Sequence, residues 1–195
     1  MRLRKCFAVG SAVVASSRTV ELFRRVDAFE HSWCLRLNRS CLLPGVRDVF
    51  AAVSRLGDGI FWYTLVLSLP LVYGEAGLYP ALRMTVVGFA GVTLYKYLKA
   101  RLVRERPYIS LTDIVPGTKV LDRYSFPSGH TLHAVSFSTL ITVSFPELGW
   151  LCIPFAALVA MSRVVLGLHY PSDVAAGAVI GAGLALLSMA LVPLA

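Results

Sequence analysis

Long apolar runs dominate the chain after residue 60. Because an α-helix needs about 20 mainly apolar residues to cross a bilayer, this pattern predicts a bundle of membrane-spanning helices. The run over 60–73 is short and predicts a span only if the residues before it add a turn. We expect residues 74–80, rich in glycine and proline, to form a tight turn. The runs occupy residues 60–73, 81–98, 127–145, 148–161 and 174–195, the last with 22 residues and no charge.

The first 59 residues follow a different pattern. We expect an N-terminal amphipathic segment over residues 1–59 and a membrane core over residues 60–195. Apolar residues at helical spacing alternate with arginine and glutamate over residues 19–37, which predicts an amphipathic helix with Trp33 as its anchor in the membrane interface. The favoured interpretation is a helix that packs on the bundle and has no part in catalysis. Residues 46–56 predict a second amphipathic helix that leads into the membrane.

Residues 6–23 leave two interpretations open. Arg2, Arg4 and Lys5 precede an apolar stretch and then small residues, as in a signal peptide. The apolar part is short and weakly hydrophobic, which favours an uncleaved first span over a cleaved leader.

The composition indicates a small membrane protein with one domain. The 195 residues are 56% hydrophobic and 15% charged, with a mean hydropathy of +0.68 and a formal net charge of +8. Soluble domains carry about 25% charged residues. The positive charge suits anionic lipid headgroups or a positive-inside loop. Nucleic acid is disfavoured as a partner, since no soluble domain would present the charge, and the oligomeric state is left open.

Cysteines and small residues carry less functional information. The four cysteines lack metal-ligand spacing, and Cys34 and Cys41 could form a disulfide only in an oxidising compartment. Cys6 and Cys152 lie in apolar runs. Gly177 and Gly181 form a GxxxG pair, which we expect to pack within the bundle rather than to form a dimer.

Residues 162–173 combine ionisable side chains with a position between two apolar runs. Ionisable residues are costly near lipid and are functional candidates by default. Pro171 favours the first turn of a helix, which would bring Asp173 within reach of His169. A carboxylate that fixes one imidazole nitrogen leaves the other basic, as a nucleophile or base requires. Arg163 adds a planar fork of donors that suits a phosphate or carboxylate.

Two further polar clusters should emerge on the same membrane face, because successive spans alternate in direction. Lys99 offers a point charge and Arg106 a bidentate donor. The segment Pro127-Ser-Gly-His130 should open a helix whose free backbone N–H groups can bind an anion, and His130 could protonate a leaving group. Taken singly, each cluster could be a helix cap or a solvated ion pair, and His133 is best interpreted as a polar helix residue.

Together the clusters suit phosphoryl transfer in which cations spread the charge on the phosphoryl oxygens. No group of carboxylates suited to a metal accompanies them, so no divalent cofactor is expected. The spacing resembles the type-2 phosphatidic acid phosphatase superfamily, which includes lipid phosphate phosphatases, undecaprenyl-diphosphate phosphatases and vanadium haloperoxidases. The resemblance covers residues 99–173. It rests on Lys99 separated by six residues from Arg106-Pro107, on Pro127-Ser-Gly-His130, and on Ser162-Arg163 separated by five residues from His169, which three residues separate from Asp173.

The resemblance implies an all-α fold, here a polytopic membrane bundle of five or six transmembrane helices. It also implies that His169 is a nucleophile forming a phosphohistidine, that Asp173 is its partner and that His130 is the general acid. The implied function is an integral membrane lipid phosphatase without a cofactor. Its substrate would be undecaprenyl diphosphate or a phosphatidate-like lipid, with the first slightly favoured. The residues that would hold the phosphate are Lys99, Arg106, Ser128, Gly129 and Arg163.

Two other functions compete with this one. A non-catalytic protein that binds or transports lipid phosphates could retain the pocket, although binding alone needs neither a nucleophile nor an acid. A vanadate-dependent haloperoxidase would share the anion pocket, but membrane spans suit a lipid substrate better.

Two arguments disagree on orientation in a bacterial inner membrane. Several arginines before residue 60 should lie on the same side as the site, which the positive-inside rule assigns to the cytoplasm. The resemblance favours the outer face, and a span over residues 6–23 would produce that topology with six crossings. We expect an extracytoplasmic active site.

Overall fold

The computed structural model describes residues 17–43, 45–111, 113–118 and 122–192. Within these ranges the secondary structure is helical, apart from one antiparallel bridge between Glu105 and Tyr124. The predicted all-α fold is confirmed. Most of the possible leader or first span over residues 6–23 lies outside the described residues.

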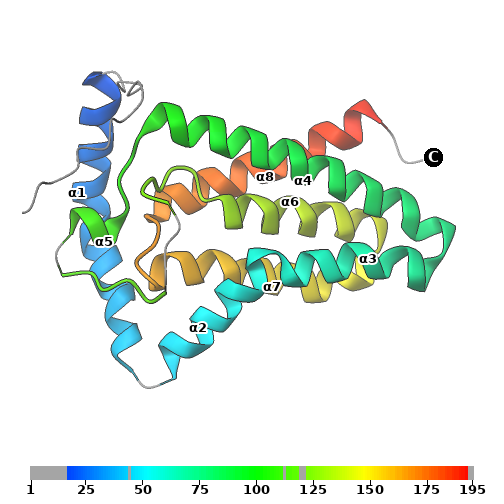
Figure 1. Ribbon diagram of the computed structural model, residues 1–195, viewed down its shortest axis with the longest axis horizontal. Coiled ribbons are helices and arrows are strands. Elements are labelled where there is room, and N and C mark those ends of the chain that lie inside the picture. Colours follow the sequence, from blue (N-terminus) through cyan, green and yellow to red (C-terminus); the bar gives the residue numbers. More distant parts are fainter. Residues whose placement is uncertain (1–16, 44, 112, 119–121, 193–195) are drawn as a thin grey trace, which may run out of the picture.

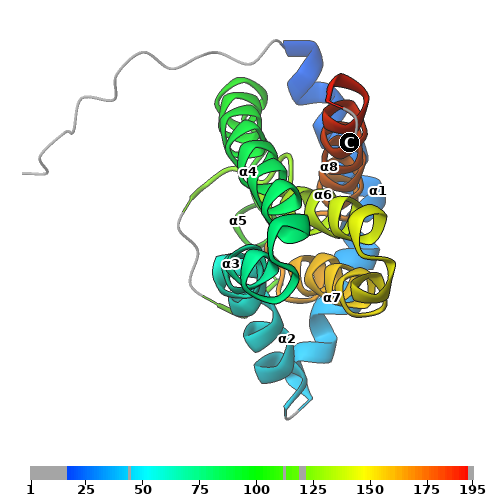
Figure 2. The same ribbon diagram turned by 90° about the vertical axis from the view of Figure 1, so that its right-hand side faces the viewer.

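The bundle consists of helices that run side by side along the long axis of the molecule (Figure 1). Figure 2 looks along this axis and shows α6 in the centre, where it packs against α4, α7 and α8. Large buried side chains such as Trp62, Met84 and Leu140 fill the space between the helices. The bundle helices are α3 (Phe61–Tyr73), α4 (Glu75–Leu102), α6 (Gly129–Ser144), α7 (Pro146–Val165) and α8 (Pro171–Leu191).

Four helical segments within the described residues are long and apolar enough to cross a membrane, which supports the polytopic bundle. In the first of these, α2 (Val46–Arg55) is joined to α3 through η2 (Leu56–Ile60), where the helix is kinked at Gly59. These preceding residues supply the extra turns that the short run 60–73 requires. Helix α6 has only 16 residues, many of them buried in the centre of the bundle. The four segments are Val46–Tyr73, Glu75–Leu102, Pro146–Val165 and Pro171–Leu191.

The predicted tight turn over residues 74–80 is wrong. Gly74, with a φ of +59°, reverses the chain, and α4 begins at Glu75 and includes Pro80. Gly77 serves a different purpose, because a Cβ at this position would lie 2.1 Å from the carbonyl oxygen of Leu69 in α3. This glycine permits a close crossing of two helices rather than a loop.

The GxxxG pair of α8 faces the backbone of α6. A Cβ at Gly177 would lie 2.5 Å from the carbonyl oxygen of Ser128, and one at Gly181 would lie 2.3 Å from that of Leu132. The two glycines therefore let α8 approach α6 closely, so the prediction that they pack within the bundle is confirmed.

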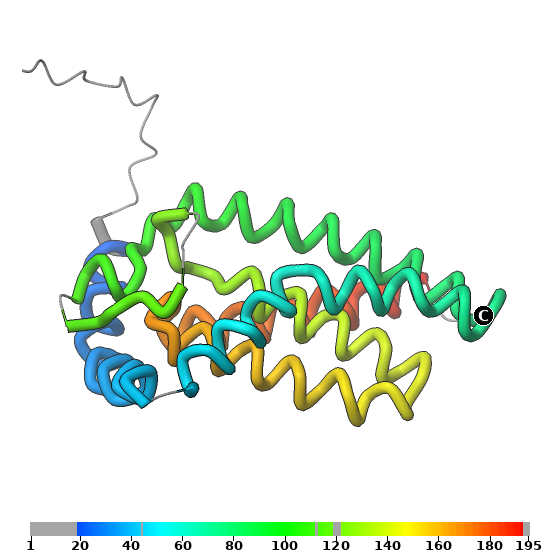
Figure 3. The backbone as a smooth tube through the Cα atoms, turned by 60° about the horizontal axis from the view of Figure 1, so that its bottom comes forward, coloured from blue at the N-terminus to red at the C-terminus, as the bar shows by residue number. Residues whose placement is uncertain are grey.

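Helix α1 (Ser17–Arg39) lies across the end of the bundle (Figures 1 and 3). A helix is thus present where the amphipathic pattern predicts one, but its buried side is partly polar. Glu30 and Asn38 are buried against the bundle, whereas Phe29 and Trp33 are mostly exposed. The short helix η1 (Ser40–Leu42) follows, and the connection from α4 to α6 adds α5 (Pro107–Ser110) at the same end.

Candidate active site

The three polar clusters meet at one end of the bundle. The C-terminal ends of α4 and α7 lie there with the N-terminal ends of α6 and α8 (Figure 1). A cavity of about 530 Å³ opens at this end and runs between the helices. Ser128 and Asp173 lie outside its lining. The predicted site residues that line it are Lys99, Arg106, Gly129, His130, Arg163 and His169.

A tight turn after α7 positions His169. Gly167, with a φ of +70°, adopts the left-handed conformation that favours glycine and caps the helix by donating its N–H to the carbonyl of Val164. The N–H of His169 donates to the carbonyl of Arg163 at 3.0 Å. Pro171 occupies the first turn of α8, as predicted. The short connection therefore holds the His169 ring between two helix ends.

The imidazole of His169 is buried, and its two nitrogens face different partners. Nε2 lies 3.3 Å from Nη1 of Arg106. A guanidinium can only donate, so we assign Nε2 as the acceptor and the ring proton to Nδ1. Burial and the positive charges of Arg106, Arg163 and Lys99 lower the pKa of His169 well below its ordinary value. The ring is therefore neutral near pH 7, with the lone pair of Nε2 on the side of Arg106.

Asp173 faces Nδ1 of His169, but less closely than expected. Its Oδ2 lies 3.6 Å from Nδ1, within ion-pair range but longer than a hydrogen bond. The same oxygen accepts from the N–H of Tyr170 at 2.9 Å, while Oδ1 accepts from Nη1 of Arg104 at 2.5 Å. The carboxylate is thus held mainly by Arg104 and Tyr170, and Arg104 is a partner that the sequence did not indicate.

Arg163 lies in the last turn of α7, because this helix continues to Val165, beyond the predicted span over residues 148–161. Its side chain is buried, and Nη1 donates to the hydroxyl of Ser54 in α2. Its Nε has no hydrogen-bond partner among the described residues. A buried guanidinium with an unpaired N–H is a strong candidate for binding an oxyanion.

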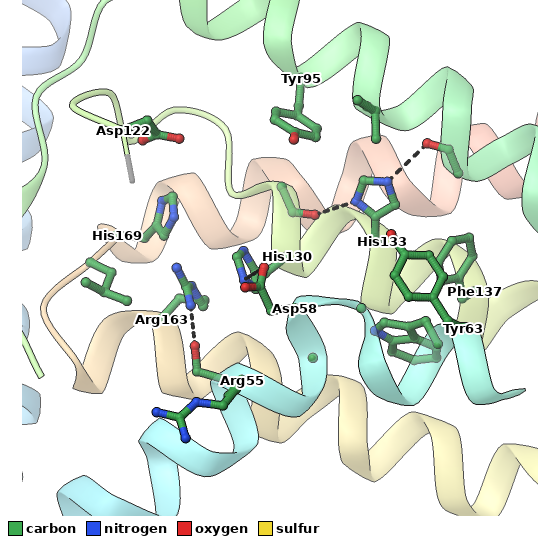
Figure 4. A pocket seen from close by; sticks show the side chains of 18 of the residues that line it. Arg55, Asp58, Tyr63, Tyr95, Asp122, His130, His133, Phe137, Arg163 and His169 are labelled. Atoms are coloured by element: carbon green, nitrogen blue, oxygen red, sulfur yellow. Dashed lines mark hydrogen bonds and ion pairs between the residues drawn. The ribbon is translucent and has the colours of Figure 1, made fainter. Parts of the chain in front are cut away.

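Lys99 and Arg106 share a carboxylate that sequence analysis missed. Nζ of Lys99 lies 2.9 Å from Oδ2 of Asp122, and Nη2 of Arg106 lies 2.5 Å from Oδ1. Burial acts to raise the pKa of Asp122, but hydrogen bonds from Arg106 and Lys99 lower it overall. Asp122 is therefore ionised at neutral pH and lies against two cations of the candidate phosphate site. Figure 4 shows its carboxylate across the opening from Arg163.

The start of α6 presents His130 to the cavity. Ser128 is the N-cap, because its hydroxyl accepts from the backbone N–H of Thr131; it also lies 3.0 Å from the Thr131 hydroxyl. The Ser128 side chain does not line the cavity. Gly129 lines the cavity beside the ring of Tyr95. Of the predicted phosphate ligands in this segment, Gly129 has direct access to the cavity and Ser128 supports the backbone.

His130 has an acidic partner, Asp58, that the sequence analysis did not identify. Nε2 of His130 lies 2.9 Å from Oδ1 of Asp58 (Figure 4). Asp58 belongs to the segment η2 between α2 and α3, which is kinked at Gly59, where φ is +130°. The sequence signal was available as Gly57-Asp58-Gly59, a flexible acidic tripeptide inside a helical pattern.

Away from these charges the cavity becomes apolar. Its far part is lined by Trp62 and Val66 of α3, Met84 and Phe89 of α4, and Phe137 of α6. Tyr63 and Phe89 line the cavity and are also largely exposed at the surface of the bundle. The cavity thus joins a charged end to an apolar wall between α3 and α4.

His133 lies one turn beyond His130 and connects two helices. Its Nδ1 lies 2.9 Å from the carbonyl oxygen of Gly129, and its Nε2 lies 3.1 Å from that of Gly88 in α4 (Figure 4). Both nitrogens are therefore engaged with backbone, as suits a polar helix residue. Within the described residues, no three histidine, cysteine, aspartate or glutamate side chains are arranged to hold a metal ion, and Cys34, Cys41 and Cys152 are free thiols.

Comparisons with curated proteins point to phosphatases. The lipid A 1-phosphatase of Rhizobium etli is 34% identical over 108 residues, which cover 53% of this chain and 46% of that protein. The undecaprenyl-diphosphatase of Sulfolobus acidocaldarius is 35% identical over 99 residues, 48% of this chain and 45% of that protein. A 57-residue stretch is 47% identical to the bacitracin transport permease protein BcrC of Bacillus licheniformis and covers 29% of this chain and 28% of that protein. The matched regions thus span less than half the length of these relatives.

Two solved structures share the fold. The transmembrane PAP2 type phosphatidylglycerolphosphate phosphatase from Bacillus subtilis superposes with a TM-score of 0.66 at 24% identity, over 89% of this chain and 94% of that chain. Aquifex aeolicus LpxE superposes with a TM-score of 0.67 at 23% identity, over 82% of this chain and 93% of that chain. The sequence profile of the PAP2 superfamily matches residues 77–195, more than half of the chain and all three polar clusters, so this chain belongs to the PAP2 superfamily.

Proposed function

We propose that this protein is an integral membrane lipid phosphatase that cleaves a phosphate ester or diphosphate through a phosphohistidine. The main support for the proposal is that the cavity is charged at one end and apolar at the other. Lys99, Arg106 and Arg163 line its polar end, and aromatic and aliphatic side chains line the part between α3 and α4. A lipid phosphate has the matching distribution of charge and apolar surface.

In the proposed reaction, Nε2 of His169 attacks the phosphorus and the bond to the leaving oxygen breaks. The leaving oxygen takes a proton from His130, and the phosphoryl group remains on His169. Water then attacks the phosphohistidine, gives its proton to His130, and the P–N bond breaks to release phosphate. The neutral state of His169 and the acceptor role assigned to its Nε2 support the first step.

The three cations stabilise the charge on the phosphoryl oxygens. Arg163 offers an unpaired Nε–H, and Lys99 and Arg106 become available when the phosphate replaces the carboxylate of Asp122. The backbone at Gly129 adds the N-terminal end of α6, whose dipole also favours an anion. These interactions support a phosphate-binding role for Lys99, Arg106, Gly129 and Arg163, with Ser128 as the cap that fixes the backbone.

Undecaprenyl diphosphate and phosphatidate-like lipids are the candidate substrates, since the relatives named above include an undecaprenyl-diphosphatase and a lipid A 1-phosphatase. Tyr63 and Phe89 are largely exposed where they line the cavity, which supports entry of an acyl or prenyl chain from the lipid. We place the protein in a bacterial inner membrane with the site on the extracytoplasmic face.

The second candidate is a protein that binds or transports a lipid phosphate without cleaving it, since one relative is named a transport permease. Phosphate release from a panel of undecaprenyl diphosphate, phosphatidate and phosphatidylglycerol phosphate by purified protein separates the two. We expect release by the parent protein, none by His169→Ala, and an acid-labile phosphate on the parent after rapid quenching. Binding of the lipids without release by the parent protein would favour the second candidate.

A further inference from the structure

Arg104 is the centre of a buried polar cluster behind the candidate active site. Its guanidinium lies between the rings of Phe23 and Tyr170, with centroids 5.1 Å and 4.1 Å from Cζ. Nε donates to Asp27 at 2.9 Å, Nη2 to Glu30 at 2.9 Å, and Nη1 to Ser172 at 2.7 Å and to Asp173 at 2.5 Å. Every nitrogen of the group is therefore bonded, and a lysine ammonium could not reproduce this arrangement.

The backbone before Arg104 has an unusual conformation. Val103 ends α4 with a φ of +45°, in the left-handed region where a β-branched residue is a genuine outlier. Such backbone strain persists only where the surrounding structure requires it. Here it turns the chain at the end of α4, so that Lys99 lines the cavity while Arg104 is buried behind it.

Helix α1 completes the cluster. Asp27 and Glu30 both accept from Arg104, and Glu30 also accepts from the backbone N–H of Ser172 at 2.6 Å and from its hydroxyl at 2.7 Å. Ser172 and Asp173 lie in the first turn of α8. Glu30 therefore fastens α1 to the helix start that carries Asp173.

The position of Asp173 depends on this cluster. Arg104 holds Oδ1, which leaves Oδ2 directed at the N–H of Tyr170 and at Nδ1 of His169. Asp173 is fully buried, so without Arg104 its charge would be uncompensated, and the carboxyl would rotate or take up a proton. Either change would remove the interaction that fixes the orientation of the His169 ring.

We propose that Arg104, held by Asp27 and Glu30 of α1, is a positioning residue that orients Asp173 and through it His169. Helix α1 is then part of the support of the active site, contrary to the sequence-based expectation that it has no part in catalysis. The inference rests on the proposed function for its kinetic consequences, whereas its structural consequence, the state of the His169 ring, can be measured independently.

The test compares Arg104→Lys and Glu30→Gln with the parent protein. The matched control is Glu21→Gln, which changes a carboxylate on the exposed side of the same helix, where it pairs with Arg24 and Arg25. We expect both cluster variants to lose about 10- to 100-fold in kcat, by analogy with the loss when the residue that orients a metal-bound histidine is replaced. KM should stay within about 3-fold of the parent value, because the phosphate contacts are unchanged. The control should retain the parent values.

The second measurement is ¹⁵N NMR of histidine-labelled protein in micelles, where the four histidines can be assigned by replacing each in turn. The parent should show His169 as the neutral tautomer protonated at Nδ1, and both cluster variants should show a mixed or altered state. If Arg104→Lys does not fold, the comparison of Glu30→Gln with the parent protein decides the proposal. Thermal unfolding then checks that Glu30→Gln is folded.

A parent-like kcat together with parent-like His169 signals in a folded cluster variant would overturn the proposal, as would a loss confined to KM. If the parent released no phosphate from any lipid, the proposed function would fail, and the NMR comparison would still decide whether Arg104 positions His169.

Discussion

Oδ1 of Asp58 lies 2.9 Å from Nε2 of His130, although Asp58 belongs to η2 and His130 to the start of α6, 72 positions later in the chain. The contact depends on the kink between α2 and α3, because Gly59 adopts a φ of +130° that other residues avoid. A carboxylate at this distance stabilises a protonated imidazole and orients it. Asp58 therefore orients the proposed general acid, and its negative charge favours the protonated imidazole against burial and the charge of Arg163, which disfavour it.

This relationship predicts a dependence on the leaving group. Asp58→Asn should slow phosphoryl transfer from a lipid phosphate by about 10-fold or more, since general acid catalysis contributes about 10²- to 10⁴-fold. It should change transfer from p-nitrophenyl phosphate little, because nitrophenolate leaves without a proton. Rapid-quench measurement of the phosphoenzyme reports the relevant step for both substrates.

His130→Ala should show the same selectivity with a larger loss. Asp48→Asn, which alters an exposed carboxylate of α2, is the matched control and should behave like the parent. Equal losses on the two substrates after Asp58→Asn would mean that Asp58 supports the fold of the cavity rather than the acid.

The carboxylate of Asp122 predicts a change in affinity. Asp122 is half-exposed and pairs with Lys99 and Arg106, so a bound phosphate must displace it. Asp122→Asn should lower KM for a lipid phosphate and the inhibition constant of inorganic phosphate by about 2- to 5-fold, as expected for loss of a partly exposed ion pair. The effect should shrink at high salt. Asp113→Asn, in the same connection and exposed, is the control. Weaker phosphate inhibition in Asp122→Asn would indicate that Asp122 orders the two cations for binding instead.

Sequence reasoning located the site because its residues are spaced along helix ends. The spans alternate in direction, so Lys99, His130 and His169 had to emerge together, and Pro171 marked the start of α8. Local signals of this kind are readable from sequence, since proline and glycine restrict the backbone wherever they occur. The C-terminal end of α7 was harder to predict from the sequence, because apolar residues continue past Arg163.

The partners of these residues could not be read in the same way. Asp58, Asp122 and Arg104 reach the site through tertiary contacts between segments far apart in the sequence, and nothing in their spacing relates them to a histidine. Glu30 resembled an ordinary charge on an amphipathic helix. Its burial against α8 reverses the usual rule that the polar face of a helix is solvated.

The neutral state of His169 predicts the pH dependence of activity. Nucleophilic attack needs neutral His169 and leaving-group protonation needs charged His130, so the rate should follow a bell whose limbs belong to the coupled pair. Burial and the cations Arg106 and Arg163 lower the pKa of His169, so the acid limb of kcat should lie below about pH 6.5, the ordinary histidine value. A flat profile, or an acid limb above that value, would contradict the two-histidine mechanism.

The same shift carries a stability consequence with a definite sign. The unfolded chain protonates His169 near its ordinary pKa, whereas the folded state resists protonation until a lower pH. Protons therefore favour the unfolded state as pH falls below about 6.5, and this contribution to stability is fully present above it. His169→Gln should weaken the fall in thermal stability between neutral and mildly acid pH, measured against the parent protein.

The orientation in the membrane is the prediction with the most direct test. Lys99, Arg106 and Arg163 line the cavity and would lie at this end in either orientation, so they carry no information about the side. The arginines of α1 and α2 do carry it, and they favour a cytoplasmic site by the positive-inside rule. The resemblance to bacterial lipid phosphatases of this family favours the outer face instead, and on that ground we predict an extracytoplasmic site.

The test uses single cysteines in a background from which Cys6, Cys34, Cys41 and Cys152 have been removed. Val115→Cys lies at the site end, where the side chain is 67% exposed, and Glu75→Cys lies exposed at the opposite end of the bundle. In intact spheroplasts, a membrane-impermeant maleimide should label Val115→Cys and spare Glu75→Cys until the membrane is permeabilised. The reverse pattern would place the site in the cytoplasm. Because the two positions lie at opposite ends of one rigid bundle, each serves as the control for the other, and retained phosphate release by both variants would show that the labelled proteins are correctly folded.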